Sequence, residues 1–338
     1  MKRVITALAL AAVTASVVAP AAAATLDTVK SRGMLNCGAN GQLPGFGIPD
    51  TQGVWTGLDV ELCRAVAAAI FNDPAKVKFV ALTAKDRFTA LQSGDVDLLV
   101  RNTTWTSSRD SQLGLNAAGV NYYDGQGFII RKSLKLNSAL ELNDAAVCVQ
   151  QGTTTELNLA DYFRANKMRL KTVTFATLDE AVRAYDTSRC DAFTTDASGL
   201  YSVRPKLVRP DDHVVLPEII SKEPLGPFVR HGDDQWFDIV KWVHFAMVNA
   251  EEFNVTKANV DEQMNSDNPE IKRLLGTEGN FGEQLGLTRD WVYRIVKHVG
   301  NYGEAFERNL GQASALKITR GQNALWTKGG LQYAPPIR

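Results

Sequence analysis

The sequence has little histidine, little cysteine and no excess of charge of either sign. Its 338 residues include four histidines, four cysteines, 37 basic and 37 acidic residues. This balance excludes the strongly basic surface that attracts nucleic acid or an anionic membrane, so neither partner is expected. The histidines are scattered along the chain and none belongs to a His-Glu-x-x-His motif, so no metal site is predicted.

Sequence motifs that carry catalytic chemistry are also absent. The chain has no Gly-x-Ser-x-Gly nucleophile elbow, no phosphate-binding loop ending in Gly-Lys-Ser/Thr and no Cys-x-x-Cys pair. These absences favour binding over turnover. We therefore predict no catalytic residue and no cofactor.

Long apolar stretches are absent after residue 24. No later segment reaches the ~18 consecutive apolar residues of a membrane-spanning helix. Near the start, Lys2 and Arg3 precede an apolar stretch from Val4 to Val18, and Ala22-Ala23-Ala24 follows it. This pattern predicts a secretory signal over residues 1–24, because the stretch is too short for an uncleaved anchor of about 20 residues. A soluble, exported chain is expected.

The four cysteines of an exported chain are expected to form disulfides, for which three pairings exist. Cys37 lies in a predicted first strand, and Cys63 lies on the helix predicted over residues 58–70, which should pack against that strand. Cys148 and Cys190 each stand at the head of a predicted strand, and neighbouring parallel strands bring such residues together. We favour these two pairs; buried free thiols are the alternative.

Two parts of the chain share one plan. Residues 87–99 and 180–193 each read as the end of a helix, a turn and a strand, and the strands run into the polar loops Asn102–Thr104 and Thr194–Asp196. In α/β sheets, ligands bind at the carboxyl ends of strands, so the two loops predict two lobes that face one cleft. Chance recurrence of a common unit is the alternative.

Glycine and proline predict where the chain passes between the lobes. Asn121–Gly127 and Glu223–Phe228 each lead into a strand, and two connecting strands make a hinge. We therefore assign residues 25–125 and 226–338 to lobe one, with a C-terminal helical extension, and residues 126–225 to lobe two.

The polar loop of lobe one contains groups that suit a carboxylate. Asn102 and Thr104 follow a strand, and Arg109 lies near the start of a predicted helix. A guanidinium fork, a hydroxyl and free backbone N–H groups pair a carboxylate through charge-assisted hydrogen bonds. A solvated or structural arginine is the alternative.

Lobe two offers a polar rim and an acid. Gln151, Gly152, Thr153 and Thr154 lie between a strand and a helix, where glycine permits close approach and threonines with helix-start amides donate hydrogen bonds. Asp196, at the mouth of a strand, accepts from an ammonium group; a helix-capping aspartate is the alternative. Together the two sides predict a clamp for a free α-amino acid.

In this order, the motifs resemble those of the solute-binding proteins of polar amino acid ABC transporters, and the tail is similar to the branch that binds general L-amino acids. The matching segments are Ala90–Asp97, Asn102–Arg109, Gln151–Thr154 and Cys190–Asp196, with Val299–Glu304 and Asn323–Leu331 in the tail. The resemblance implies a type II periplasmic-binding-protein-like α/β fold, with two lobes joined by a two-strand hinge. It also implies a periplasmic monomer that delivers a free L-amino acid to an inner-membrane ABC permease complex.

The resemblance also implies roles for single residues. Arg109 and Thr104 would hold the α-carboxylate together with Thr154, and Asp196 would hold the ammonium group. The chain departs from several relatives at Asn40, where aspartate is common, at Arg101, where a small hydroxyl residue is common, and at Ala84, where an aromatic platform is common.

These departures bear on which side chains the cleft accepts. Arg87 and Arg101 offer positive charge to an acidic side chain, and Trp105 offers cover to an apolar one. We therefore predict a broad L-amino acid binder with a polar or acidic preference. The alternatives are a narrow glutamate, aspartate or glutamine binder, a cyclohexadienyl-dehydratase-like enzyme using Glu61 or Asp97 as acid or base, and a sensor domain.

Overall fold

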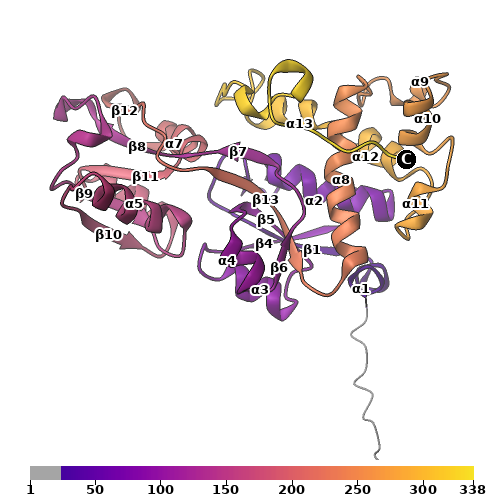
Figure 1. Cartoon of the computed structure of the whole chain (residues 1–338), viewed down its shortest axis with the longest axis horizontal. Coiled ribbons are helices and arrows are strands. Elements are labelled where there is room, and N and C mark those ends of the chain that lie inside the picture. The colour runs from indigo at the N-terminus through magenta and orange to yellow at the C-terminus, as the bar shows by residue number, and fades with distance from the viewer. Residues whose placement is uncertain (1–23) are drawn as a thin grey trace, which may run out of the picture.

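The computed structural model describes residues 24–338, which form two α/β lobes, with further helices packed on the first lobe (Figure 1). Each lobe is built on its own sheet. The predicted secretory signal lies outside the described residues, apart from Ala24. Over residues 24–338, no helix is both long enough and apolar enough to span a membrane.

The first lobe contains a six-stranded sheet in the order β4-β1-β5-β13-β6, with β7 paired to β13. β4, β1 and β5 are parallel, and β13 is antiparallel to β5, β6 and β7. The strands of this sheet are β1 (Leu35–Ala39), β4 (Val77–Ala81), β5 (Leu98–Thr104), β6 (Leu115–Ala117), β7 (Tyr122–Asp124) and β13 (Glu223–Arg230). A separate hairpin consists of β2 (Ile48–Pro49) and β3 (Trp55–Thr56).

Helices on this sheet bury its apolar residues. They are α1 (Thr25–Arg32), α2 (Leu58–Phe71), α3 (Arg87–Ser93), α4 (Ser107–Ser111) and α8 (Asp234–Glu252). α2 is apolar on most sides because it packs against both β5 and α8, and Leu62, Cys63 and Val66 on it are fully buried. The prediction of a helix over residues 58–70 is confirmed within one residue.

The second lobe contains a five-stranded sheet in the order β10-β9-β11-β8-β12. β10, β9 and β11 are parallel, and β8 is antiparallel to β11 and β12. The elements are β8 (Gln126–Arg131), β9 (Ala146–Gln150), β10 (Lys171–Phe175), β11 (Ala192–Asp196) and β12 (His213–Val215), with helices α5 (Thr154–Ala165), α6 (Leu178–Asp186) and α7 (Ala197–Val203). Aromatic and aliphatic residues of β8 and α5, including Phe128 and Phe163, meet in the core of this lobe.

Both favoured disulfides are present. Cys37 on β1 is bonded to Cys63 on α2, with Cα atoms 6.3 Å apart, and Cys148 on β9 is bonded to Cys190, with Cα atoms 5.7 Å apart. β11 begins at Ala192, so Cys190 precedes this strand instead of standing in it. The pairing still follows from parallel neighbours, because β11 pairs directly with β9.

The two sheets are joined at β7 and β13. These strands pair antiparallel, with Asp124 opposite Glu223, and the chain enters lobe two at Gly125. We expected lobe one to resume at residue 226, but β13 begins at Glu223. The chain therefore returns to lobe one before this strand, and not within its proline-containing part. The strand tolerates Pro227 because its register shifts at a bulge between Gly226 and Phe228, and Pro224 lies next to the first residue of the strand.

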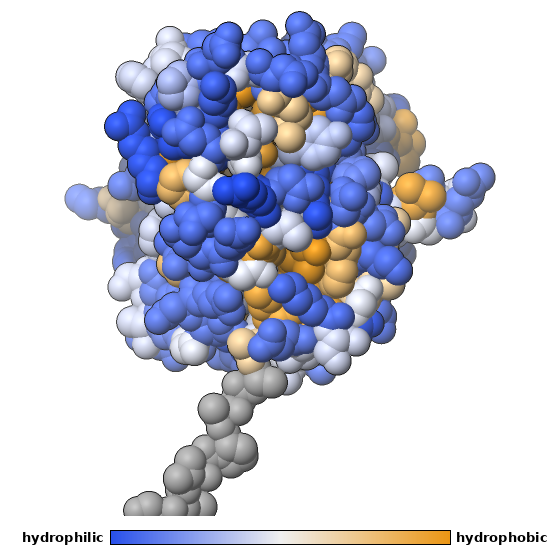
Figure 2. Space-filling view, turned by 90° about the vertical axis from the view of Figure 1, so that its right-hand side faces the viewer, coloured by the Kyte–Doolittle hydropathy of each residue, from blue (hydrophilic) through white to orange (hydrophobic). Residues whose placement is uncertain are grey.

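The C-terminal extension packs on lobe one. It contains α9 (Val260–Gln263), α10 (Pro269–Leu275), α11 (Phe281–Gln284), α12 (Trp291–His298) and α13 (Tyr302–Asn309), followed by short 3-10 turns at Gly321–Asn323 and Trp326–Lys328. The predicted amphipathic helix is α12, whose buried side contacts α2 and α8. Figure 2 shows the face that lies on the right-hand side of Figure 1. This face is largely hydrophilic, with apolar side chains gathered in one area of its lower half.

The extension also holds one strand of the hinge. Asn323 pairs with the backbone of Tyr123 in both directions, accepting from its N–H at 2.7 Å and donating to its carbonyl at 3.0 Å. The hydroxyl of Tyr302 donates to the Asn121 carbonyl at 2.8 Å, and the Gln332 amide donates to the Val120 carbonyl at 3.1 Å. We call these three side chains, Tyr302, Asn323 and Gln332, the hinge clamp. Asn323 thus bonds to β7 itself, and the other two side chains bond to the two residues that precede this strand.

Removing the central member of the hinge clamp should destabilise the protein. Asn323→Ala leaves the Tyr123 N–H and carbonyl without their partners, so we expect a loss of about 1–3 kcal/mol in the free energy of unfolding. Asn309→Ala is the matched control, because the Asn309 amide bonds only to the Ala305 carbonyl of its own helix. Urea unfolding of both variants measures the difference, and equal losses would contradict the role of Asn323.

Candidate ligand-binding cleft

A small cavity lies where the carboxyl ends of β5, β9 and β11 meet the start of α5. Its walls come from both lobes, and the lining residues are Arg87, Arg101, Asn102, Thr104, Gln150, Thr153, Thr154, Thr155, Thr195 and Asp196. Most of the residues predicted for the site are therefore brought together. Gln150, Thr155 and Thr195 were missed, although each directly adjoins a predicted motif at the end of a strand or the start of a helix.

Three predicted residues lie beside the cavity and not in its wall. Arg109 is buried, with one guanidinium nitrogen donating to the Thr104 carbonyl. Asn40 donates through its amide to the side-chain oxygen of Asn102 at 2.7 Å. The Gln151 backbone N–H donates to the Phe175 carbonyl. Asn40 therefore contacts the wall residue Asn102, and Arg109 contacts the wall residue Thr104.

Lobe one contributes three buried guanidinium groups that lie close together at the cleft. We call these residues, Arg87, Arg101 and Arg109, the cleft arginines. They are 2%, 3% and 6% exposed, and among residues 24–338 none of them forms an ion pair. Burial lowers the pKa of Arg101 and of Arg109 to about 10. Burial and the two neighbouring guanidinium groups also lower the pKa of Arg87 well below its usual value.

The contacts of Arg87 leave part of its donor capacity free. One terminal nitrogen donates to the Arg101 carbonyl at 3.4 Å and to the Thr103 hydroxyl at 3.3 Å, both long contacts. Its Nε is buried and has no hydrogen-bond partner within the described chain. A buried cation with a free donor is costly, so an anionic ligand group is the natural complement of this wall.

The buried acid Asp196 lies close to the cleft arginines, and Asp124 lies close to Asp196. Burial raises the pKa of Asp196 well above its usual value, and the nearby carboxyls of Asp124 and Glu223 raise it further. Burial also raises the pKa of Asp124 to about 6, against hydrogen bonds from Ser198 and Gly125. An ammonium group placed beside Asp196 would stabilise its ionised form.

A further acid supports the lobe-one wall and was not predicted. Asp59, in the first turn of α2, accepts from the Asn102 backbone N–H at 2.7 Å and from the Asn121 amide at 3.1 Å. It thereby holds Asn102 in a left-handed conformation with φ 32°. Burial raises the pKa of Asp59 to about 6. Its position at a helix start was the available signal in the sequence.

The lobes touch across the cleft, so the described arrangement is closed. The Thr104 and Thr154 hydroxyl oxygens lie 3.2 Å apart. The side-chain oxygen of Gln42 accepts from the Leu178 N–H at the start of α6, at 3.1 Å. Gly152 permits this approach, because a Cβ at this position, with φ +73°, would lie 3.3 Å from the Lys85 Cα.

Both threonine hydroxyls meet the same carboxylate. Thr104 donates to Glu223 Oε2 at 2.5 Å and Thr154 donates to the same oxygen at 2.8 Å. Each hydroxyl has one hydrogen, so neither is free to donate to a ligand at the same time. Of the donors that the sequence predicted for a carboxylate, an arginine and backbone N–H groups therefore remain. The sequence pattern indicated Glu223 only as part of the hinge.

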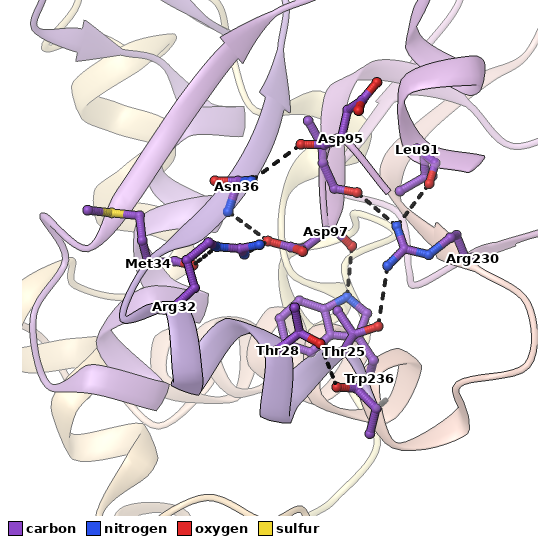
Figure 3. Close-up of polar contacts among 12 residues, drawn as sticks. Thr25, Thr28, Arg32, Met34, Asn36, Leu91, Asp95, Asp97, Arg230 and Trp236 are labelled. Carbon is purple, nitrogen blue, oxygen red and sulfur yellow. Dashed lines mark hydrogen bonds and ion pairs between the residues drawn. The ribbon is translucent and has the colours of Figure 1, made fainter. Parts of the chain in front are cut away.

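Asp97 and Glu61, the acids considered for catalysis, lie in structural ion pairs. Asp97 precedes β5 and accepts from Arg32 and from the Asn36 N–H, while its carbonyl accepts from the Trp236 indole (Figure 3). β5 spans seven residues, so the cavity at its other end is roughly 20 Å away. Glu61 pairs with Arg308 at 3.1 Å. Neither acid lines the cavity.

Comparison with known proteins gives consistent matches. The sequence model of the bacterial extracellular solute-binding proteins, family 3, matches residues 35–260. The chain is 60% identical to a general L-amino acid-binding periplasmic protein of Rhizobium johnstonii, over 97% of each chain. It is 55% identical to a glutamate/glutamine/aspartate/asparagine-binding protein of Rhodobacter capsulatus, again over 97% of each.

A solved structure is similar over nearly the whole chain. An ABC transporter periplasmic binding protein from Brucella ovis, with glutathione bound, has a TM-score of 0.92 and 62% identity. The match covers 94% of this chain and 100% of that chain.

Ionisation of Asp124 should lower the free energy of unfolding of the ligand-free protein. Its pKa of about 6 in the folded state exceeds the value of 3.8 for an unperturbed aspartate, so the folded state binds the proton more tightly than the unfolded state. This contribution is complete below pH 4 and is lost as the pH rises through 6. We expect Asp124→Asn to remove a decline on the order of 2–3 kcal/mol between pH 4 and pH 7.

Denaturant unfolding at several pH values measures this decline. Asp144→Asn is the control, because Asp144 is paired with Arg169 at the surface and that contact lowers its pKa. The same pH dependence in the wild type and in Asp124→Asn would contradict the assignment.

Proposed function

The chain belongs to the bacterial extracellular solute-binding proteins, family 3, and on this premise we propose that it captures free L-amino acids in the periplasm for an ABC transporter. It delivers them to an inner-membrane permease complex. The observation that carries the proposal is the cavity between the lobes, with Arg87 and Arg101 in one wall, Asp196 in the other and Arg109 directly beside it. A zwitterionic ligand supplies the opposite charge to each wall.

The residues have separate tasks in this proposal. Arg109 and the backbone N–H of Thr154 hold the α-carboxylate, and Asp196 holds the ammonium group. Thr104 positions Arg109 through its carbonyl. The remaining wall, which includes Asn102 and Thr153, surrounds the ligand side chain with hydrogen-bonding groups.

Side-chain preference follows from the unpaired positive charge. Arg87 and Arg101 remain in the wall after Arg109 has taken the α-carboxylate, so a second carboxylate or a polar amide is favoured there. The names of the two similar proteins, one for general L-amino acids and one for glutamate, glutamine, aspartate and asparagine, agree with a broad polar or acidic preference.

The Brucella ovis protein was solved with glutathione bound, and glutathione carries the two groups that this site is proposed to hold. The γ-glutamyl end of this peptide keeps a free α-carboxylate and a free ammonium group, and the peptide continues from the side-chain position. Recognition through the two α-groups therefore extends to γ-linked peptides that fit the cleft.

Ligand favours closure because it touches both lobes. Lobe one supplies Arg109 and lobe two supplies Thr154 and Asp196, so all these contacts form together only when the hinge is closed. The chain acts in this proposal as a monomer and not as an enzyme. Glu61 and Asp97, the possible acids, are engaged in ion pairs away from the cavity.

Calorimetric titration of the ligand-stripped protein tests the function. The panel is L-glutamate, L-glutamine, L-alanine, L-leucine, L-histidine, D-glutamate and glutathione. We expect several L-amino acids to bind with micromolar or tighter affinity, near −8 kcal/mol, and L-glutamate to bind more tightly than L-leucine. Binding of a single side-chain class would indicate the narrow alternative, and no binding across the panel would refute the proposal.

Arg109→Ala tests the carboxylate contact. Because the ligand carboxylate loses its buried partner, we expect a cost on the order of 3–5 kcal/mol, or roughly two to four decades of affinity, for every ligand. Arg109→Lys keeps the charge but not the planar fork, and should recover only part of the loss. Unchanged affinity in the alanine variant would exclude Arg109 from the site.

A further inference from the structure

Glu223 is a buried carboxylate at the junction of the two lobes. It is the first residue of β13, it is 1% exposed, and it does not line the cavity. Oε2 accepts from the hydroxyls of Thr104 and Thr154. Oε1 accepts from the Asn158 amide at 2.7 Å and from the Ser221 hydroxyl at 2.7 Å. Both oxygens are therefore doubly occupied.

The four donors come from three parts of the molecule. Thr104 ends β5 in lobe one, whereas Thr154 and Asn158 lie on the first two turns of α5 in lobe two. Ser221 belongs to the segment that returns from lobe two to β13. One carboxylate thus joins the ends of the two walls of the cavity, at the point where the chain crosses between the lobes.

We propose that Glu223 is a positioning residue that fastens α5 to β5 and thereby sets the balance between the open and closed forms. Charge-assisted hydrogen bonds to a buried carboxylate are stronger than neutral ones, and opening the cleft would separate Thr154 and Asn158 from Thr104. Because Glu223 does not touch the cavity, this contribution is the same for every ligand. Side-chain preference is left to the wall residues.

The predicted change in affinity rests on the proposed function, whereas the predicted change in compactness of the ligand-free protein does not. If closed forms lose stability without Glu223, the ligand-free protein becomes less compact, whatever the ligand is. Compaction and affinity therefore give two separate measurements.

Glu223→Gln is the direct test. The amide places an NH₂ group opposite donors, so one pair of hydrogen bonds is lost while size is kept. We expect affinity for all amino acids that bind the wild type to fall by a common factor of about ten to a hundred, with their rank order unchanged. The radius of gyration of the ligand-free protein, from small-angle scattering, should increase.

Glu218→Gln is the matched control. Glu218 lies in the same returning segment, but it accepts from Ser138, which belongs to lobe two as well. This variant should change neither affinity nor compaction. Asn158→Ala supplies a second test if Glu223→Gln fails to fold. It removes only a donor from α5 and should lower every affinity by one smaller common factor.

Two results would overturn the proposal. One is an altered rank order of ligands in Glu223→Gln, which would put the residue in the cavity wall. The other is unchanged compaction together with unchanged affinity. If the wild-type protein binds no amino acid, the proposed function fails, whereas an increased radius of gyration in Glu223→Gln alone would still support the role of Glu223 in closure.

Discussion

The burial of ionised groups at the junction of the two lobes is the constraint on which the rest of the structure depends. Cleft arginines and acids have been removed from water there, and each must be compensated by hydrogen bonds or by a ligand. The polar ends of strands, Asp59 behind Asn102, and Glu223 between the lobes supply the internal part of this compensation. The Nε of Arg87 has no hydrogen-bond partner within the described residues, so it remains available to the proposed ligand.

Much of this could be predicted from the sequence, because its determinants are local. The apolar period of α2, the turn before α5 and the polar ends of β5 and β11 each follow from a few consecutive residues. The type II periplasmic-binding-protein fold is confirmed, as is the resemblance to amino-acid-binding proteins of ABC transporters.

The rest could not be predicted because it depends on contacts between residues distant in the sequence. Glu223 meets Thr104 across 119 residues, and Asn323 meets Tyr123 across 200. A glutamate between a lysine and a proline carries no local sign that four donors will surround it. The prolines of β13 suggested a connection, whereas the bulge that lets Pro227 stay in the strand is set by the pairing of β13 with β5.

The two disulfides have a consequence for the order of events during export. Cys37–Cys63 and Cys148–Cys190 close loops of 26 and 42 residues, and the first loop ends before the second begins. Lobe one, by contrast, needs β13, which follows the whole of lobe two. A chain that emerges from its N-terminus can therefore oxidise both pairs in sequence, without a mispairing step, before the residues that complete the first sheet have crossed the membrane.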